Sequence, residues 1–280
     1  MKLGLFGINF GPCADPAVAA RVAQAAEAAG YESVWTGEHV VLPDPQAPPS
    51  PAAPQTPMLD PAVTLGFLAG HTRRIRLATG IIILPQRNPL VLAKELASVD
   101  VVSGGRLIAG LAAGYLKAEF DALGVSFERK GERADEAIEV LRTLWTQPKP
   151  SFRGEFWSFS GIQAHPMPVQ KPHPPIVVGG HSPGAFRRAV RQGNGWYGFA
   201  LDLERTRACV AGLEKARAEV ARPAELGKLE IGLTPAVALD RDTVRRYEDL
   251  GVERLVPIAR GRTADELVAF VEQTARAVQG

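Results

Sequence analysis

A histidine next to a glutamate is the first candidate for chemistry in this sequence. Glu38 and His39 stand directly after the short apolar segment 32–36. Imidazole is the side chain best suited to moving a proton near neutral pH, and a neighbouring carboxylate can orient it. We interpret the two residues as a proton-transfer pair, with a structural hydrogen-bonding pair as the alternative.

A glycine-rich turn is the second candidate. Gly179 and Gly180 follow an apolar segment, and glycines let the backbone approach a ligand closely. Ser182 precedes Pro183 and is expected to cap a helix, whose free N–H groups and dipole favour an anion. His181 could add a hydrogen bond. The sequence therefore predicts a phosphate-binding turn, and the alternative is an ordinary glycine turn with a serine cap.

Small residues follow two further strand-like segments. Gly80 interrupts the apolar run IRLATGIIIL, between Thr79 and Ile81. A glycine in such a run often marks a bulge or a close approach to the backbone. A later segment ends at Gly114 and Tyr115, where the glycine leaves space and the tyrosine could flank a planar ring. Close packing of strand against helix is the alternative for this second position.

Other catalytic and metal-binding motifs are absent from the sequence. No two histidines have the spacing of metal ligands on one helix face, so we expect no metal site. There is no GxSxG elbow, no P-loop, and no GxGxxG after the first apolar segment. Hydrolase, NTPase and open dinucleotide-binding folds are therefore not supported.

The candidate site residues must be positioned by the secondary structure, which the sequence predicts as apolar strands that alternate with helices. Strands are expected over residues 2–8, 32–36, 75–84, 106–111, 175–178, 196–199, 229–239 and 254–258. Strands separated by helices form a parallel sheet. Eight such units in 280 residues predict a closed (β/α)8 TIM barrel, forming a single domain over 1–280. The candidates above all fall at C-terminal strand ends, where such barrels carry their active sites.

Two segments interrupt the alternation. The proline-rich segment 42–60 cannot form a helix and has few backbone donors for a sheet. It follows the second strand and is expected at the active-site face as a lid or substrate loop, with a disordered surface excursion as the alternative. The second insertion, 147–174, contains FRGEFWSF, which predicts a short hairpin.

Composition and charge argue against several partners. The net charge is +2, 22% of residues are charged, and Lys and Arg form no run of five, so no nucleic-acid or membrane-surface partner is expected. No stretch approaches the roughly 18 apolar residues of a membrane span, and the N-terminal apolar run is too short for a signal peptide. Cys13 and Cys209 form no CxxC pair, and we expect reduced thiols in a cytoplasmic protein.

Four stretches together resemble the luciferase-like monooxygenase and coenzyme F420-dependent oxidoreductase superfamily. They are WTGEHVVLP, ATGIIILPQRNPLVLAKELASVDVVSGGRLIAGLAAGYLKAEFDALG, EAIEVLRTLW and HPMPVQKPHPPIVVGGHSPGAFRRA. The resemblance covers residues 1 to about 200 well and the last third loosely. The long second stretch is specific, whereas the glycine turn alone would not be.

The resemblance implies a TIM barrel with a flavin-type cofactor at its C-terminal face. Glu38 and His39 would face the reactive part of the cofactor ring. Gly80–Ile81 would be a non-proline cis peptide that forms a bulge behind the ring, as in F420-binding members. Residues 179–182 would be the phosphate-binding turn.

Two positions depart from the superfamily pattern. Many members carry Trp where Tyr115 stands, and bacterial luciferases carry a phosphate-binding Arg where this chain has Ala113. Small residues at the latter position are common in members assigned to F420. Ala113 therefore favours F420 over FMN.

The first functional hypothesis is hydride transfer between F420 and a small, fairly apolar organic substrate, with His39 as proton donor or acceptor and Glu38 as its orienter. The second is an FMN-dependent monooxygenase, supplied with reduced FMN by a separate reductase. The third is a flavin-binding protein without turnover, against which the Glu38–His39 pair argues. A separate flavin or F420 reductase is thus a possible partner, and the resemblance implies a homodimer.

Overall fold

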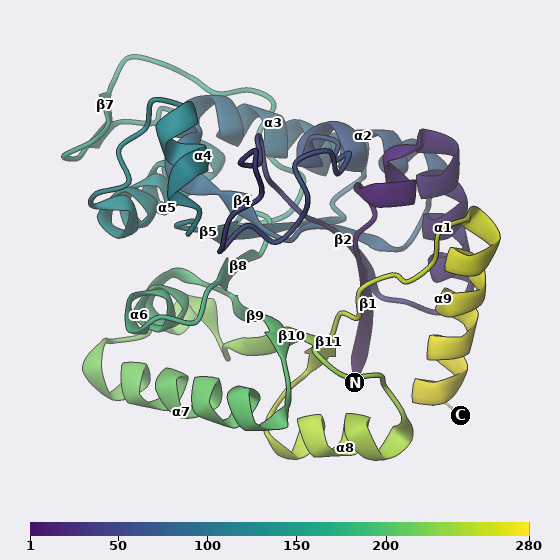
Figure 1. The fold of residues 1–280 in the computed structure, drawn as a ribbon. Helices are drawn as coiled ribbons and strands as arrows, with labels where there is room; N and C mark the ends of the chain where they lie inside the picture. Colours follow the sequence, from purple (N-terminus) through teal and green to yellow (C-terminus); the bar gives the residue numbers. More distant parts are fainter. Residues whose placement is uncertain (280) are drawn as a thin grey trace.

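A computed structural model describes residues 1–279 and shows a ring of strands surrounded by helices (Figure 1). The strands of the ring are parallel. They are β1 (Lys2–Phe6), β2 (Ser33–Thr36), β3 (Arg76–Thr79), β4 (Ile82–Ile83), β5 (Leu107–Ala112), β8 (Ile176–Gly179), β9 (Gly195–Leu201), β10 (Glu230–Pro235) and β11 (Arg254–Leu255).

The sheet closes on itself and confirms the predicted (β/α)8 TIM barrel. Its order is β3-β2-β1-β11-β10-β9-β8-β5-β4, and β3 also pairs with β5, where Leu77 lies opposite Leu107. After a short interruption β4 continues along β5, with Ile82 opposite Leu111. Strands β3 and β4 therefore lie one after the other along β5 and together form one strand of the barrel. The nine strand segments thus build a barrel of eight strands.

The helices lie outside the ring and connect consecutive strands (Figure 1). They are α1 (Pro16–Ala28), α2 (Pro61–His71), α3 (Pro89–Val102), α4 (Lys117–Ala122), α5 (Lys130–Thr146), α6 (Pro183–Gln192), α7 (Leu203–Glu219), α8 (Arg241–Asp249) and α9 (Ala264–Gln279). The expected cap of α6 is confirmed, because the Ser182 side chain accepts a backbone N–H, and Asp15 and Asn88, each also followed by proline, cap α1 and α3 in the same way.

Aromatic and apolar side chains fill the inside of the barrel. Phe6, Trp35, Ile108, Tyr197 and Val256 belong to one buried cluster. The rings of Trp35 and Tyr197 stack with centroids 5.0 Å apart. A separate, larger apolar core includes buried residues of the surrounding helices and of the strands. The inside of the barrel is therefore a packed core rather than a channel, so a ligand can bind only at one of its two ends.

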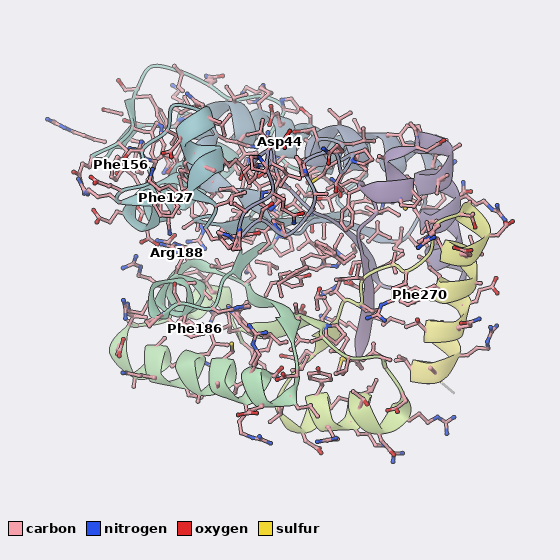
Figure 2. The ribbon with its side chains drawn as sticks, in the orientation of Figure 1. Asp44, Phe127, Phe156, Phe186, Arg188 and Phe270 are labelled. Atoms are coloured by element: carbon pink, nitrogen blue, oxygen red, sulfur yellow. The ribbon has the colours of Figure 1, made fainter. Side chains whose placement is uncertain are left out.

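Charged side chains gather at the N-terminal end of the barrel. Arg254 is buried, donates to Glu32 and Glu230, and lies 5.7 Å from the Trp35 ring. These ion pairs lie at the end of the barrel where residues typically serve stability. Away from this end, Arg188 on α6 (labelled in Figure 2) donates to Asp135 and to the Gly131 carbonyl in the first turns of α5.

The structure differs from the expected elements chiefly in two strands and one helix. The run 75–84 is not one strand, because it is interrupted at Gly80–Ile81 and turns into a 3-10 helix at Leu84–Gln86. The seventh expected strand, 229–239, ends at Pro235. Helix α4 was not predicted at all. The hairpin expected within 147–174 is confirmed as β6 (Phe152–Arg153) and β7 (Ser158–Phe159).

Two absences apply to the described part of the chain. Among residues 1–279, no helix has both the length and the apolar character needed to cross a bilayer. Cys13 and Cys209 are buried and unpaired.

Candidate active site

His39 lies at the C-terminal end of β2 between two side chains from the segment that follows β5. Its Nδ1 is 3.1 Å from Oε2 of Glu119, and its Nε2 is 3.3 Å from the hydroxyl of Tyr115. The other oxygen of Glu119 accepts the backbone N–H of Val40 at 2.6 Å. The Glu119 side chain is fully buried and that of His39 is 8% exposed. The imidazole is therefore held from both ring nitrogens.

Glu38 does not orient His39, contrary to the expectation from their adjacency. Its carboxylate accepts two hydrogen bonds from Arg87, one of them 2.9 Å from Nε, and a third from the Ile83 N–H. Arg87 also donates to Asp60 at 2.7 Å. Consecutive side chains of an extended chain point to opposite sides. Glu38 therefore hydrogen-bonds Arg87 and Ile83 in the barrel wall, while His39 contacts Glu119.

The protonation states of the His39 contacts follow from their surroundings. Burial raises the pKa of the Glu119 carboxyl, but the contacts of the carboxylate, of which the hydrogen bond to His39 is the strongest, together outweigh burial, so the net shift is downward. Burial and the Glu119 charge raise the pKa of Tyr115. An ionised Glu119 can only accept, so Nδ1 of His39 carries the proton. Nε2 is then the acceptor for the Tyr115 hydroxyl.

Gly80–Ile81 is a non-proline cis peptide, which confirms the expectation drawn from the resemblance. The C-terminal end of β8 approaches this segment closely: a Cβ added to Gly179 would come within 1.8 Å of Cδ1 of Ile81. The Thr79 hydroxyl is already hydrogen-bonded within the barrel. It donates to the Gly110 carbonyl and accepts the Gly110 N–H, both at 2.7 Å. Thr79 therefore binds β3 to β5 and has little capacity left for a cofactor.

The glycine turn after β8 has the geometry of an anion site. Gly180 has φ +122°, and a Cβ there would lie 2.9 Å from that of Ala185. Ser182 caps α6 by accepting the Ala185 N–H at 3.2 Å. His181 accepts the backbone N–H of Phe199 at 3.0 Å through Nε2, so its own N–H lies on Nδ1. The remaining N–H groups and the dipole of α6 face the C-terminal end of the barrel.

A cation lies beside this turn and was not singled out from the sequence. Burial lowers the pKa of His181, and the charge of Arg205, on α7, lowers it further. Arg205 donates to the carbonyl of Ala200 at 3.3 Å, and it forms no ion pair with the described residues 1–279. A guanidinium near such a turn suits a phosphate. These residues therefore fit a phosphate-bearing cofactor without the Arg that Ala113 replaces.

The proline-rich segment 42–60 ends at the same face of the barrel (Figure 1). Its Met58 sulfur lies 3.1 Å from the backbone nitrogen of His39. The buried Asn9 side chain donates to the carbonyls of Gly37 and Leu59, at 2.9 and 2.6 Å. Asp44, labelled in Figure 2, belongs to the more exposed part of the segment. The lid hypothesis is thus compatible with this placement and stays a prediction.

The site residues come from four neighbouring barrel positions. His39 follows β2, Ile81 follows β3, Gly114 and Tyr115 follow β5, and residues 179–182 follow β8. Glu119, like Arg205, was missed by sequence reasoning. Carboxylates flank Phe120 on both sides, at Glu119 and Asp121, and nothing in the sequence alone marked Glu119 as the one that is buried with Phe120. Within the described residues, no group of three His, Cys, Asp or Glu side chains is arranged to hold a metal.

Chemically, this arrangement offers a histidine that is fixed in one tautomer and a glycine turn that suits a phosphate. Both lie at the open end of a barrel whose interior is apolar and aromatic. The histidine can take up or release a proton at Nε2, and the turn can hold the anionic end of a cofactor.

Comparisons with known proteins agree with the geometry. The sequence model of the luciferase-like monooxygenase family matches residues 6–276. An uncharacterized protein of Mycobacterium tuberculosis is 32% identical over 273 residues, which cover 93% of this chain and 92% of that protein. The oxygenase component of the flavin-dependent trigonelline monooxygenase of Acinetobacter baylyi is 33% identical over 172 residues, covering 61% of this chain and 44% of that protein.

A solved structure gives the same fold. The F420-dependent secondary alcohol dehydrogenase, in complex with an F420–acetone adduct, superposes with a TM-score of 0.79 over 99% of this chain and 98% of its own, at 16% identity. The match of the family model over nearly the whole length, together with this barrel, leaves one assignment. The chain belongs to the luciferase-like monooxygenase family.

Proposed function

We propose that this protein catalyses hydride transfer between F420 and a small, fairly apolar organic substrate. The observation that carries the proposal is the His39 imidazole, held by the buried Glu119 in the tautomer that leaves Nε2 as proton acceptor. When bound, the cofactor would supply or accept the hydride. Ala113, which stands where bacterial luciferases carry an Arg, favours F420.

The chain's own residues would manage the proton that accompanies the hydride. Nε2 of His39 would take the proton of a substrate hydroxyl as its carbon loses a hydride, or return it in the reverse direction. Glu119 would stabilise the resulting imidazolium through Nδ1. Tyr115 would hand over its hydrogen bond at Nε2 to the substrate.

The cofactor would be held along the C-terminal ends of β3, β5 and β8. Ile81 would support one face of the ring. Gly114 has φ +77°, and a Cβ there would lie 2.5 Å from Cγ2 of Ile83 and 2.8 Å from the Phe120 ring, so this glycine permits close packing beneath the cofactor site. Gly179, Gly180, His181 and Ser182 would bind a phosphate with the N-terminus of α6. Arg205 would add the positive charge that this turn itself lacks.

An FMN-dependent monooxygenase is the second candidate, and one observation favours it. A relative that is 33% identical over 172 residues is the oxygenase component of a flavin-dependent monooxygenase. In that case a separate reductase would supply the reduced flavin, and the apolar barrel mouth would exclude water from the reaction. A flavin-binding protein without turnover has no use for the buried Glu119–His39 pair.

Binding of F420 and of FMN to the purified protein, measured side by side by fluorescence titration, tests the proposal. We expect submicromolar F420 affinity that weakens at least tenfold in Gly180→Asp, because Gly180 has φ +122°, its Cβ would contact Ala185, and the carboxylate would repel phosphate. Gly251→Asp is the matched control, since Gly251 has φ +83° with open space around it.

Each outcome of this titration decides between the candidates. Tight FMN binding instead of F420 binding, followed by substrate-dependent oxygen uptake, would replace the proposal by the monooxygenase. If Gly180→Asp binds F420 as tightly as Gly251→Asp does, the assignment of residues 179–182 to phosphate binding is contradicted. Absence of binding to either cofactor would refute both candidates.

The homodimer implied by the resemblance stays a prediction, and one surface supports it. Val63 and Phe67 on α2 are 69% and 38% exposed, and neighbouring α3 exposes Val91. Residues 61–70 of α2 contain no charged side chain, which is unusual for a solvent-facing helix. Multi-angle light scattering is expected to give twice the 30.0 kDa chain mass, and a monomer in wild type would contradict the prediction.

A further inference from the structure

A cavity lies at the N-terminal end of the barrel, away from His39 and the glycine turn. Its volume is about 540 Å³, and it is lined by Arg76, Arg142, Lys171, His173, Asn194 and Glu225 among others. Arg76 begins β3, Asn194 directly precedes β9, and Arg142 lies in the last turns of α5. A cavity of this size is in the range of small-molecule sites and belongs to the face that such barrels do not use for catalysis.

Positive charge dominates the wall of this cavity. Arg76, Arg142 and Lys171 face a single lining carboxylate, that of Glu225. Among residues 1–279, Arg142 and Lys171 form no ion pair, and the Lys171 ammonium donates only to the carbonyl of Pro168, at 3.1 Å. Burial lowers the pKa of Arg142, although Glu139 and Glu225 counteract it. An anion would supply the missing counter-charge.

Two neighbouring polar groups are buried without hydrogen-bond partners. One is Nε of Arg142 itself, and the other is the whole side-chain amide of Gln192, which is 3% exposed. The two residues are in contact, because Nη2 of Arg142 donates to the Gln192 carbonyl. Buried polar atoms without partners are rare in folded proteins and call for an explanation. Of the two, only Arg142 lines the cavity, and an acceptor atom of a ligand bound there would lie beside its guanidinium.

We propose that this cavity binds a small phosphorylated molecule. The phosphate lies between Arg142 and Lys171, because a guanidinium binds phosphate oxygens in a fork and an ammonium adds a point charge. The rest of the molecule packs against Pro172, Pro175 and Leu226, which form the apolar part of the wall. This phosphate site is separate from residues 179–182, which lie at the opposite end of β8.

Calorimetric titration of the whole protein with inorganic pyrophosphate, at constant ionic strength, tests the proposal. We expect saturable binding with a dissociation constant below about 1 mM, weakened roughly tenfold or more in Arg142→Gln and in Lys171→Gln, because each removes a charged hydrogen bond. Arg276→Gln is the matched control: its side chain is 70% exposed on α9, and its affinity should stay within about twofold of wild type.

The variants also separate this cavity from the proposed cofactor site. Gly180→Asp is expected to leave the pyrophosphate affinity unchanged, whereas binding that disappears in this variant would place the anion at the glycine turn and overturn the proposal. An equal loss in Arg142→Gln and Arg276→Gln would show non-specific attraction and overturn it as well. Circular dichroism of Arg142→Gln establishes that the variant is folded, and Lys171→Gln, at an exposed residue, repeats the test independently of folding.

Discussion

Replacing Glu119 by glutamine is expected to lower kcat by about 100-fold or more, with little change in cofactor affinity. The two oxygens of Glu119 accept from Nδ1 of His39 and from the Val40 N–H. Glutamine has one oxygen and an NH2 group, so one of these donors would face another donor. Either the loop at Val40 shifts or His39 adopts the other tautomer and loses its acceptor at Nε2.

The Glu119→Gln prediction has readouts that a purely structural role would not move. In the variant, kcat should fall with KM nearly unchanged, and ¹⁵N NMR of the imidazole should show the proton leaving Nδ1. Glu128→Gln is the matched control, because Glu128 is exposed and lies in the loop after α4. If kcat falls less than about threefold and the tautomer is unchanged, Glu119 has no part in proton transfer.

The pH dependence of this pair has a definite sign. The Glu119 pKa is lowered in the fold, because the contacts of the carboxylate, the hydrogen bond to His39 first among them, together outweigh burial, which raises it. The carboxylate therefore stabilises the fold fully above its unfolded pKa, about 4.3, and this contribution is lost only as the pH falls further. At neutral pH Glu119 is ionised, and the glutamine variant removes a real charge.

Much of the barrel was predictable because local signals and periodicity agree. Ser182 caps a helix where the sequence predicts it, and Asp15, Asn88 and Asp240 are caps of the same kind, which the sequence can reveal because a cap requires only neighbours in the chain. Strand ends were less predictable. The run up to Leu239 is apolar beyond Pro235, yet the sheet ends there because pairing partners end.

The candidate site shows where sequence reasoning must fail. Its positions at strand ends were predictable from the barrel alone, including His39 and the turn at Gly180. The partner of His39 was not, because Glu119 is 80 residues away and reaches it only through the fold. Glu38 was the wrong choice, because adjacency in an extended chain separates two side chains rather than joining them.

Replacing Arg87 by methionine is expected to lower the free energy of unfolding by roughly 3–5 kcal/mol near pH 7. The Glu38 side chain is 2% exposed and depends on Arg87 for two of its three hydrogen bonds. Methionine fills much of the same space, so the loss comes from an uncompensated buried carboxylate. Asp60, which caps α2 and ends the segment 42–60, loses the same partner.

Denaturant unfolding at several pH values checks the Arg87→Met prediction. Burial raises the pKa of Glu38 in the fold, although Arg87 counteracts it. A carboxyl with a raised folded pKa favours the fold below its unfolded pKa, about 4.3, and that advantage is lost as the pH rises through the folded value. Without Arg87 the folded pKa rises further, so the deficit of the variant should shrink as the pH is lowered.

A second substitution separates the buried charge from the other contacts of Arg87. In Glu38→Gln/Arg87→Met the uncompensated carboxylate is gone, so most of the lost stability should return. The exposed pair of Arg21 and Asp265 gives a matched control, and Arg21→Met should cost less than about 1 kcal/mol. If the double variant is no more stable than Arg87→Met, the loss arises from Asp60 and the segment it anchors. In that case the main role of Arg87 would be to anchor the segment 42–60 through Asp60, rather than to neutralise the Glu38 carboxylate.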